Sequence, residues 1–462
     1  MSAQKAEKKV HIKTWGCQMN VYDSERMADV MAPMGYAQTD QIGEADIVIL
    51  NTCHIREKAT EKVFSELGRM RVHKRAKEKA GGKMAFAVAG CVAQAEGAEI
   101  LRRDKNVDMV IGSQAYHQLP EIIADWEKSN GTARIINTDF PAEPKFDHLP
   151  PAQPRGPSAY IAVQEGCDKF CSFCVVPYTR GSEYSRPAAD IIAEIKTQIS
   201  YGAREVNLLG QNVNAWHGTG TDGKTWNLGT LIFHLAELDG LDRIRYVTSH
   251  PNDMHDMLYR AHGEIPQLMP YLHLPIQNGS DKILAAMNRK HTQDDYRRII
   301  DRMRDIRPDM AFSSDFIVGF PGETDADHRE TMKIVDYVGY AAAYSFKYSR
   351  RPGTPAAKAG KQVLEDIKDI RLQELQKKLY ADQTVFNTAK LGMAIPVLFD
   401  NRGKRYGQLQ GKSPWLQTVN VIAPERLLGQ IVDVKITEAT QNSLTGEVIP
   451  IAPQISSGTH AA

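Results

Sequence analysis

Residues 164–174 read Gln-Glu-Gly-Cys-Asp-Lys-Phe-Cys-Ser-Phe-Cys and place three cysteines in one short loop. These cysteines, Cys167, Cys171 and Cys174, have the spacing Cys-x3-Cys-x2-Cys. A structural zinc site needs a fourth Cys or His nearby, and the nearest candidates, His148 and His217, lie well outside the loop. A complete iron–sulfur cage also takes four thiolates. Three thiolates on one loop therefore favour a [4Fe-4S] cluster whose fourth iron is open to a ligand. The alternatives are three buried cysteines or a zinc knuckle with a distant fourth ligand.

The other three cysteines each follow a short strand-like run in the first third of the chain. They are Cys17, Cys53 and Cys91. Ligands of open parallel α/β sheets gather at the carboxyl ends of the strands, so we expect these three thiols to converge. This predicts a second three-thiolate site. The alternative is that three small side chains simply pack at the strand ends.

The composition is that of a soluble chain without a dominant charge. The length of 462 residues suggests roughly two to four domains. The net charge is +1, so any nucleic-acid surface must be a local patch. No apolar stretch approaches the ~20 residues of a membrane span, and the lysine-bearing N-terminus lacks the apolar run of a secretory signal. We expect a cytoplasmic protein whose six cysteines are not disulfide-bonded.

The first part of the chain is predicted to be an open parallel α/β domain at residues 8–140, followed by a linker. Strand-like runs alternate there with amphipathic stretches. The expected strands are Val10–Trp15, Asp46–Leu50, Met84–Ala89 and Asp108–Ile111, and the expected helices are Asp23–Met34, Glu57–Lys79 and Ala93–Arg102. Residues 141–157 are rich in proline, which predicts an extended linker.

The second part is predicted to contain a partial (β/α)6 barrel at residues 158–380 and a small all-β barrel at residues 381–450. The expected strands of the first are Ala159–Gln164, Glu205–Leu209, Arg245–Ser249, Tyr271–Pro275, Phe312–Val318 and Ala342–Tyr348. Its clearest helices are Ala188–Tyr201, Asp281–Met287, Gln293–Ile306 and Asp325–Tyr337, and a connecting helix is expected within residues 361–390. The short runs Ile395–Phe399, Gln417–Ile422, Ile431–Ile436 and Leu444–Val448 predict a five-stranded barrel. Residues 451–462 are expected to form a disordered tail.

A series of short motifs accompanies the two cysteine sets. They are Gly16–Asn20 with Asp23–Glu25, Asn51–Cys53 with Ile55–Ala59, Gly90–Gln94, Gln164–Gly181, Tyr184–Pro187, Gly210–Asn214, Ser249–Pro251, Leu272–Gln277, Met287–Lys290, Asp315–Thr324 and Arg350–Pro355. In this order they resemble the radical S-adenosylmethionine methylthiotransferases over residues 9–450. Within that family the chain is most similar to bacterial members that act on N6-dimethylallyladenosine (N6-isopentenyladenosine) of tRNA.

The resemblance implies two [4Fe-4S] clusters and S-adenosylmethionine as cofactors. Cys167, Cys171 and Cys174 would hold the cluster that cleaves S-adenosylmethionine, and Cys17, Cys53 and Cys91 an auxiliary cluster that supplies sulfur. Two molecules of S-adenosylmethionine would be used per turnover, one to form a radical and one to give the methyl group. A low-potential electron donor such as flavodoxin or ferredoxin and a sulfur donor would be partners.

Two loops of the central domain are further candidates for cofactor contacts. Gly210, Gln211 and Asn212 follow the second predicted barrel strand, where radical enzymes of this kind hold the amino group of S-adenosylmethionine; the alternative is an ordinary polar turn. Residues 319–323 follow the fifth strand and would either support the cofactor or be purely structural. The histidines, His250 and His273 among them, show no paired metal-binding spacing and are interpreted as ordinary polar residues.

The C-terminal domain resembles a TRAM-type RNA-binding domain and carries a local group of cations and aromatics. These residues are Arg402, Lys404, Arg405, Tyr406, Lys412 and Trp415. Cations with aromatic rings on a small barrel suit phosphate contact and base stacking. A second basic run, Arg69–Lys77, lies on a predicted helix and is interpreted as a solvated face, with an RNA-contacting patch as the alternative.

The resemblance predicts methylthiolation at carbon 2 of N6-isopentenyladenosine at tRNA position 37, with an anticodon stem-loop as the partner. Two sister reactions are alternatives: the same modification of N6-threonylcarbamoyladenosine, or methylthiolation of an aspartate on a ribosomal protein. A more distant alternative is a non-catalytic iron–sulfur RNA-binding protein, which the presence of all six cysteines disfavours.

Overall fold

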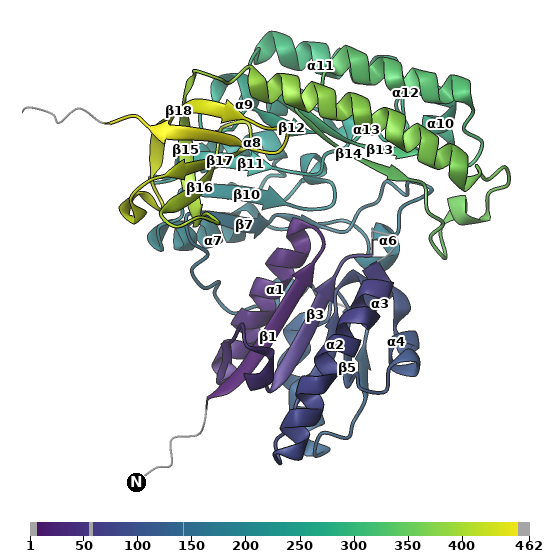
Figure 1. Cartoon of the computed structure of the whole chain (residues 1–462), viewed down its shortest axis with the longest axis vertical. Helices are drawn as coiled ribbons and strands as arrows, with labels where there is room; N and C mark the ends of the chain where they lie inside the picture. The colour runs from purple at the N-terminus through teal and green to yellow at the C-terminus, as the bar shows by residue number, and fades with distance from the viewer. Residues whose placement is uncertain (1–6, 55–58, 142, 451–462) are drawn as a thin grey trace, which may run out of the picture.

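The computed structural model describes residues 7–54, 59–141 and 143–450 (Figure 1). An N-terminal α/β domain, a central α/β domain and a small closed barrel follow one another along the chain, which confirms the predicted fold class. In Figure 1 the N-terminal domain (purple) lies below the central domain (teal to green), and the barrel (yellow) lies at its left. Among the described residues, no helix is long and apolar enough to cross a membrane.

The N-terminal domain is a six-stranded parallel sheet in the order β2-β1-β3-β4-β5-β6. Its strands are β1 (Lys8–Trp15), β2 (Tyr36–Gln38), β3 (Ile47–Thr52), β4 (Ala85–Ala89), β5 (Met109–Ile111) and β6 (Ile135–Asn137). Helices α1 (Gln18–Met31) and α5 (Leu119–Lys128) pack on one face, and α2 (Ala59–Lys79), α3 (Cys91–Glu96) and α4 (Ala98–Arg103) on the other. Because both faces are covered, β3 and β4 are buried along their whole length and read as nearly continuous apolar runs.

The central domain is a partial barrel of six parallel strands in two sheets, β11-β10-β7 and β12-β13-β14. A parallel bridge between Ile244 and Leu268 lies between the two sheets. The strands are β7 (Ser158–Ala162), β10 (Glu205–Leu209), β11 (Arg243–Tyr246), β12 (Tyr271–His273), β13 (Ala311–Val318) and β14 (Ala342–Lys347), and a short pair, β8 (Gln164–Glu165) and β9 (Tyr184–Ser185), flanks them. The helices are α6 (Val176–Thr179), α7 (Ala188–Ser200), α8 (Leu228–Ala236), α9 (Asp256–Glu264), α10 (Asp281–Ala286), α11 (Gln293–Ile306) and α12 (Asp325–Val338).

Helix α13 (Glu365–Thr388) leads into a closed five-stranded barrel in the order β15-β16-β17-β19-β18. Its strands are β15 (Ala394–Arg402), β16 (Gln408–Lys412), β17 (Thr418–Ile422), β18 (Ile431–Ala439) and β19 (Leu444–Val448). Arg243 donates hydrogen bonds to the carbonyl oxygens of Lys412 (2.8 Å) and Pro396 (2.7 Å). Because Arg243 is the first residue of β11, the barrel docks at the amino-terminal ends of the central strands.

Several elements differ from the sequence-based prediction. Helix α1 begins at Gln18 instead of Asp23, and the single helix expected at Ala93–Arg102 is broken at Gly97, whose φ of 49° is left-handed. Strands β2 and β6 were not expected because they are three-residue edge strands, and β16 and helices α8 and α9 were also not expected. The third central strand begins earlier than predicted, at Arg243, because the buried Glu205 carboxylate pairs with the arginines of this strand. The expected tail and residues 55–58 lie outside the described residues.

A candidate active site between two cysteine sets

The structure brings together Cys17, Cys53 and Cys91 at the carboxyl edge of the N-terminal sheet. Cys17 directly precedes α1, Cys53 follows β3, and Cys91 is the first residue of α3. A Cβ atom placed on Gly16 would lie 2.9 Å from the Cys53 Cβ, so the first two chain segments touch. The charges of Cys91 and Cys53 both act on the Cys17 thiol. The convergence expected from the order of strands therefore occurs.

Buried amides and glycines shape this edge of the sheet. The Asn51 side-chain amide donates to the Asn20 carbonyl oxygen (2.8 Å) and to Ser24 Oγ (2.9 Å), and both asparagines are fully buried. Gly90 has a φ of 83°, and a Cβ atom there would lie 2.2 Å from Asn51 Oδ1. A left-handed backbone and a close approach both require glycine at this position. The turn before Cys91 is thus built by Gly90 and Asn51 together.

Cys167, Cys171 and Cys174 lie on the loop after the first strand of the partial barrel. Hydrogen-bond donors point at two of the sulfurs: Arg289 Nη1 lies 3.5 Å from Cys171 Sγ, and the Val176 amide N lies 3.4 Å from Cys174 Sγ. Such donors stabilise sulfur that carries negative charge, as iron-bound thiolate does. Gly166 begins the loop with a φ of 76°, and a Cβ there would lie 1.9 Å from the Ser182 carbonyl oxygen.

One cavity of about 290 Å³ connects the two cysteine sets. Cys17 lines it from the N-terminal domain, and Cys167, Cys171 and Cys174 line it from the central domain. Apolar side chains form much of its wall: Met19, Phe173, Val175, Val176, Leu209, Val247, Ile317 and Phe346. A molecule in this cavity would therefore lie between Cys17 and the thiols of the cysteine loop in a largely apolar environment.

Burial raises the pKa of Cys167 to about 11 and that of Cys174 to about 12, and it also raises the pKa of Cys91, so these three thiols are protonated when no metal is bound. The Arg180 charge acts in the opposite direction on Cys91. Iron binds the thiolate form, so loading must release protons from these sites.

The contacts of the Cys167–Cys174 loop suit an iron–sulfur cluster better than a single zinc ion. No three His, Cys, Asp or Glu side chains in the described ranges converge closely enough to hold a single metal ion. Tetrahedral zinc with bonds of ~2.3 Å requires sulfurs only ~3.8 Å apart, whereas a four-iron cluster spreads its thiolates more widely. The N–H donors directed at Cys171 and Cys174 and the cavity beside the cysteine loop suit cluster binding at that loop.

Gly210, Gln211 and Asn212 line the same cavity at the carboxyl end of β10. Gln164 Oε1 accepts hydrogen bonds from the Gln211 (2.9 Å) and Asn212 (3.1 Å) amides, and Gln211 Oε1 accepts from the Gly166 amide (2.6 Å). These contacts tie the loop after β10 to the start of the cysteine loop. Asn212 Oδ1 is buried without a hydrogen-bond partner among the described residues.

Ser249 and His250 also line the cavity. The sequence analysis interpreted His250 as an ordinary polar residue and assigned no role to Ser249. Ser249 Oγ and His250 Nε2 are buried without a partner in the described part of the chain. His250 Nδ1 accepts a hydrogen bond from the Asn252 amide (3.2 Å), which leaves the proton on Nε2. Burial lowers the pKa of His250, so the ring is neutral. Their position after the third strand, in the Ser249–Pro251 motif, is the signal that could have identified them.

A buried charge network joins the N-terminal domain, the linker and the cysteine loop. Arg180 donates to Asp23 of α1 and to Glu165 of β8, both at 2.5 Å. Lys145 of the linker donates to the same Glu165 oxygen at 2.7 Å and lies 3.7 Å from Asp23. At most 3% of each of these four side chains is exposed. Burying charges is costly, and leaving one unpaired costs more, so this network strongly favours a single relative placement of the parts it joins.

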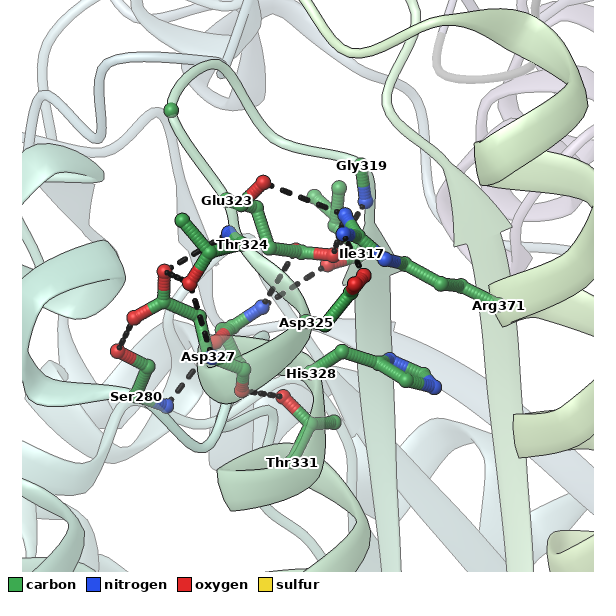
Figure 2. A network of polar contacts seen from close by, with 12 residues as sticks. Ser280, Ile317, Gly319, Glu323, Thr324, Asp325, Asp327, His328, Thr331 and Arg371 are labelled. Carbon is green, nitrogen blue, oxygen red and sulfur yellow. Dashed lines mark hydrogen bonds and ion pairs between the residues drawn. The ribbon is translucent and has the colours of Figure 1, made fainter.

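The loop at residues 319–323 does not line the cavity. Its polar contacts, drawn in Figure 2, serve the structure instead. Glu323 accepts hydrogen bonds from the Gly319 amide (3.0 Å), from Arg371 of α13 (3.0 Å) and from Asn278 (3.1 Å). Thr324 and Asp327 then form the capping box that begins α12. Of the two sequence-based interpretations of this loop, the contacts favour the structural one.

The structure separates the six candidate RNA-binding residues. Arg402, Lys404, Arg405 and Tyr406 are exposed at the turn between β15 and β16, although Arg402 pairs with Glu425, which the sequence analysis did not take into account. Trp415 instead donates from its indole to the Asp309 carbonyl oxygen (2.8 Å) in the domain interface, and Lys390 covers its ring. Lys412 is bonded to Thr418 (2.9 Å), and burial lowers its pKa.

The basic run on α2 is largely engaged within its own domain. Lys74 pairs with Asp108 (2.6 Å), Lys77 with Asp46 (2.7 Å) and Arg71 with Asp104 (3.2 Å). These cations therefore anchor α2 to the sheet.

Comparison with known proteins agrees with this division of the chain. Residues 9–112 match Uncharacterized protein family UPF0004, residues 161–335 match the Radical SAM superfamily, and residues 389–449 match the TRAM domain. A radical S-adenosylmethionine methyltransferase, TsrM, from Kitasatospora setae has a similar fold, with a TM-score of 0.55 at 13% identity over 76% of this chain and 75% of that one. The cobalamin-dependent S-adenosylmethionine radical enzyme OxsB gives a TM-score of 0.52 at 9% identity over 81% of this chain and 56% of that one.

A partial barrel with three thiols on the loop after its first strand and a match to the Radical SAM superfamily define a radical S-adenosylmethionine enzyme, a class that uses a [4Fe-4S] cluster and S-adenosylmethionine. The order of the UPF0004, Radical SAM and TRAM matches is the signature of the methylthiotransferase family, to which this chain belongs. The TRAM match also agrees with RNA binding.

Proposed function

We propose that this protein is a tRNA-2-methylthio-N6-dimethylallyladenosine synthase. It would add sulfur and a methyl group at carbon 2 of N6-isopentenyladenosine at tRNA position 37. The observation that carries this proposal is the single cavity lined by Cys17 on one side and by Cys167, Cys171 and Cys174 on the other. A base bound there would lie beside both Cys17 and the cysteine loop.

Cys167, Cys171 and Cys174 would hold the S-adenosylmethionine-binding [4Fe-4S] cluster, and Cys17, Cys53 and Cys91 an auxiliary [4Fe-4S] cluster. When bound, these groups and two molecules of S-adenosylmethionine supply the hydrogen abstraction, sulfur and methyl group that an unactivated carbon requires and that no side chain provides. The protein's own contribution is position and polarity. Arg289 and the Val176 amide donate to the thiolate sulfurs.

The polar wall of the cavity suits the amino-acid and sugar groups of S-adenosylmethionine. Gly210, Gln211 and Asn212 form one part of it, and Ser249 Oγ and His250 Nε2 add a hydroxyl and an N–H donor. A buried polar atom without a partner is costly, so a polar ligand group that satisfies it gains affinity. Apolar side chains of the same cavity, such as Leu209 and Val247, would limit the access of water to the reacting carbon.

The cavity favours an apolar base substituent over an anionic one. The isopentenyl group is apolar, as are Met19, Leu209 and Val247 of the wall. The threonylcarbamoyl group of the alternative tRNA substrate carries a carboxylate and would need a cation. Four cations line the cavity: Lys169, Lys347, Arg289 and Arg351. Lys169 pairs with Asp253 (2.7 Å), Lys347 pairs with Asp369 (2.8 Å), and Arg289 donates to the Pro275 carbonyl oxygen and to Cys171 Sγ. The carboxylate side chain of a ribosomal protein is disfavoured for the same reason.

The remaining partners follow from the chemistry and the TRAM barrel. An anticodon stem-loop would contact the exposed cations Lys404 and Arg405 beside Tyr406. The barrel docks at the amino-terminal ends of the central strands and the cavity lies at their carboxyl ends, so the RNA must span the height of the domain. A low-potential electron donor such as flavodoxin or ferredoxin and a separate sulfur donor complete the scheme, in the cytoplasm where tRNA is found.

Nucleoside mass spectrometry of tRNA from cells with and without the gene tests the proposal. We expect 2-methylthio-N6-isopentenyladenosine to disappear and N6-isopentenyladenosine to accumulate when the gene is deleted, and the chain to restore the product. Unchanged tRNA nucleosides would reject the tRNA substrate, and the intact masses of ribosomal proteins would then identify a missing methylthio group. Loss of methylthiolated N6-threonylcarbamoyladenosine would instead assign the first alternative.

A further inference from the structure

The inner face of β14 presents aromatic rings at the open side of the partial barrel. This strand pairs on one side only, with β13. Phe346 lines the cavity and Tyr344, two residues earlier on the same face, contacts the ring of His273 at 6.2 Å between centroids. The exposed fractions of the two residues are 38% and 56%. Because Phe346 lines the cavity and stays partly exposed, its ring is accessible to a ligand bound there.

A carboxylate lies next to these rings. Asp315 of β13 also lines the cavity and pairs in register with Tyr344, and Ile317 pairs in register with Phe346. His273 Nε2 lies 3.6 Å from Asp315 Oδ2, and His273 Nδ1 lies 3.0 Å from Ser313 Oγ. The imidazole therefore lies beside the carboxylate and contacts Ser313 with its other nitrogen. A carboxylate attracts N–H donors and repels phosphate, so this wall suits the edge of a base better than an RNA backbone.

The geometry points to a base-binding subsite formed by Phe346, Ile317 and Asp315. We propose that the target purine stacks on Phe346 with Ile317 beside it, and that Asp315 accepts a hydrogen bond from the exocyclic N–H of the base. The inference rests on the proposed function, since it concerns the base that is modified. A base that is reached by such chemistry must leave the helical stack, and an aromatic surface replaces the stacking that it loses. A singly substituted exocyclic amine still carries the one N–H that Asp315 requires.

The first test compares the reconstituted wild-type enzyme with Phe346→Ala and Phe346→Tyr on a stem-loop that carries N6-isopentenyladenosine. We expect Phe346→Ala to weaken stem-loop binding roughly tenfold or more and to raise KM for methylthiolation similarly. Phe346→Tyr keeps the ring and should stay within about threefold of wild type. Tyr201→Ala, at an exposed aromatic that ends α7 away from the cavity, is the matched control and should change neither value.

Two readouts separate base binding from a structural role. Cleavage of S-adenosylmethionine without RNA measures how far Phe346→Ala disturbs the cofactor in the same cavity; a loss of this cleavage as large as the loss of stem-loop binding would overturn the subsite. Binding by Phe346→Ala equal to wild type would overturn it as well. If wild type binds the stem-loop but does not methylthiolate it, the proposed function fails while the binding comparison still decides the subsite.

The role of Asp315 is tested with a base that lacks the N–H. A stem-loop with an N6,N6-dialkylated adenine at the target position should bind wild type several-fold more weakly than the monoalkylated one. Asp315→Leu should bind the two stem-loops equally, because the acceptor is gone. Discrimination that persists in Asp315→Leu would assign the recognition to another group.

Discussion

The two cysteine sets reach the same cavity by different routes. Cys167, Cys171 and Cys174 lie within one loop, so local backbone contacts such as the Cys174 amide to the Cys171 carbonyl oxygen (3.0 Å) position them. Cys17, Cys53 and Cys91 come from three strand ends and depend on the register of β1, β3 and β4 and on the buried Asn20 and Asn51. A site held by one loop tolerates changes elsewhere, whereas a site assembled by a sheet depends on distant packing.

The largest expected effect separates the chemical roles of the two sets. Cys171→Ala should abolish both S-adenosylmethionine cleavage and methylthiolation, because the cluster that binds the cofactor loses a thiolate. Cys53→Ala should retain cleavage and lose methylthiolation. Anaerobic assays of 5′-deoxyadenosine and of the modified nucleoside measure the two activities. If Cys53→Ala lost both, the second set would be needed for the architecture of the first.

The next largest effect concerns the charge network that holds the two sets in one relative position. Asp23→Asn leaves the Arg180 guanidinium with one carboxylate, Glu165, to share with Lys145. Breaking a buried ion pair in this way should lower the free energy of unfolding by about 3–5 kcal/mol, measured by denaturant unfolding of the apoprotein.

The exposed pair of Arg260 and Glu264 on α9 provides the control for this change. Arg260→Ala should have only a small effect, because an exposed ion pair contributes little to stability. An Asp23→Asn variant as stable as this control would mean that the network does not hold the domains together.

A smaller loss of stability is expected from a substitution at Gly90, in the turn that precedes Cys91. Gly90→Ala forces a Cβ atom to within 2.2 Å of Asn51 Oδ1 at a left-handed φ of 83°. We expect destabilisation of about 2–4 kcal/mol from backbone strain and overpacking together, with lower iron content at the second set. Gly81→Ala has a similar φ of 79° but open space around it, so it isolates the backbone cost of about 1–2 kcal/mol. Equal losses of stability in the two variants would show that the Asn51 side chain moves away from the new Cβ atom without cost.

Prediction from sequence succeeded where the signal was local or periodic. The cysteine loop, strand β10 at Glu205–Leu209 and helix α11 at Gln293–Ile306 were located from spacing and hydrophobic pattern. The short edge strands β2 and β6 carry too few apolar residues to be recognised, and β11 begins with arginines that become buried by pairing with Glu205. Trp415 was interpreted as an RNA contact because it lies among cations in the sequence. Its actual partner, the Asp309 carbonyl oxygen, is distant in sequence and could not be recognised from the local pattern.

The amino-acid sequence by itself determined the domain order, the two sets of three cysteines and their places after strands, because these follow from residue type, spacing and period. The tertiary structure alone decided that Cys17 shares a cavity with the cysteine loop, that Ser249 and His250 line it, and that Phe346 faces it beside Asp315. Those facts arise where segments separated by up to several hundred residues meet. The contacts between such segments depend on packing and on buried charge pairs such as Asp23 with Arg180, which no local pattern encodes.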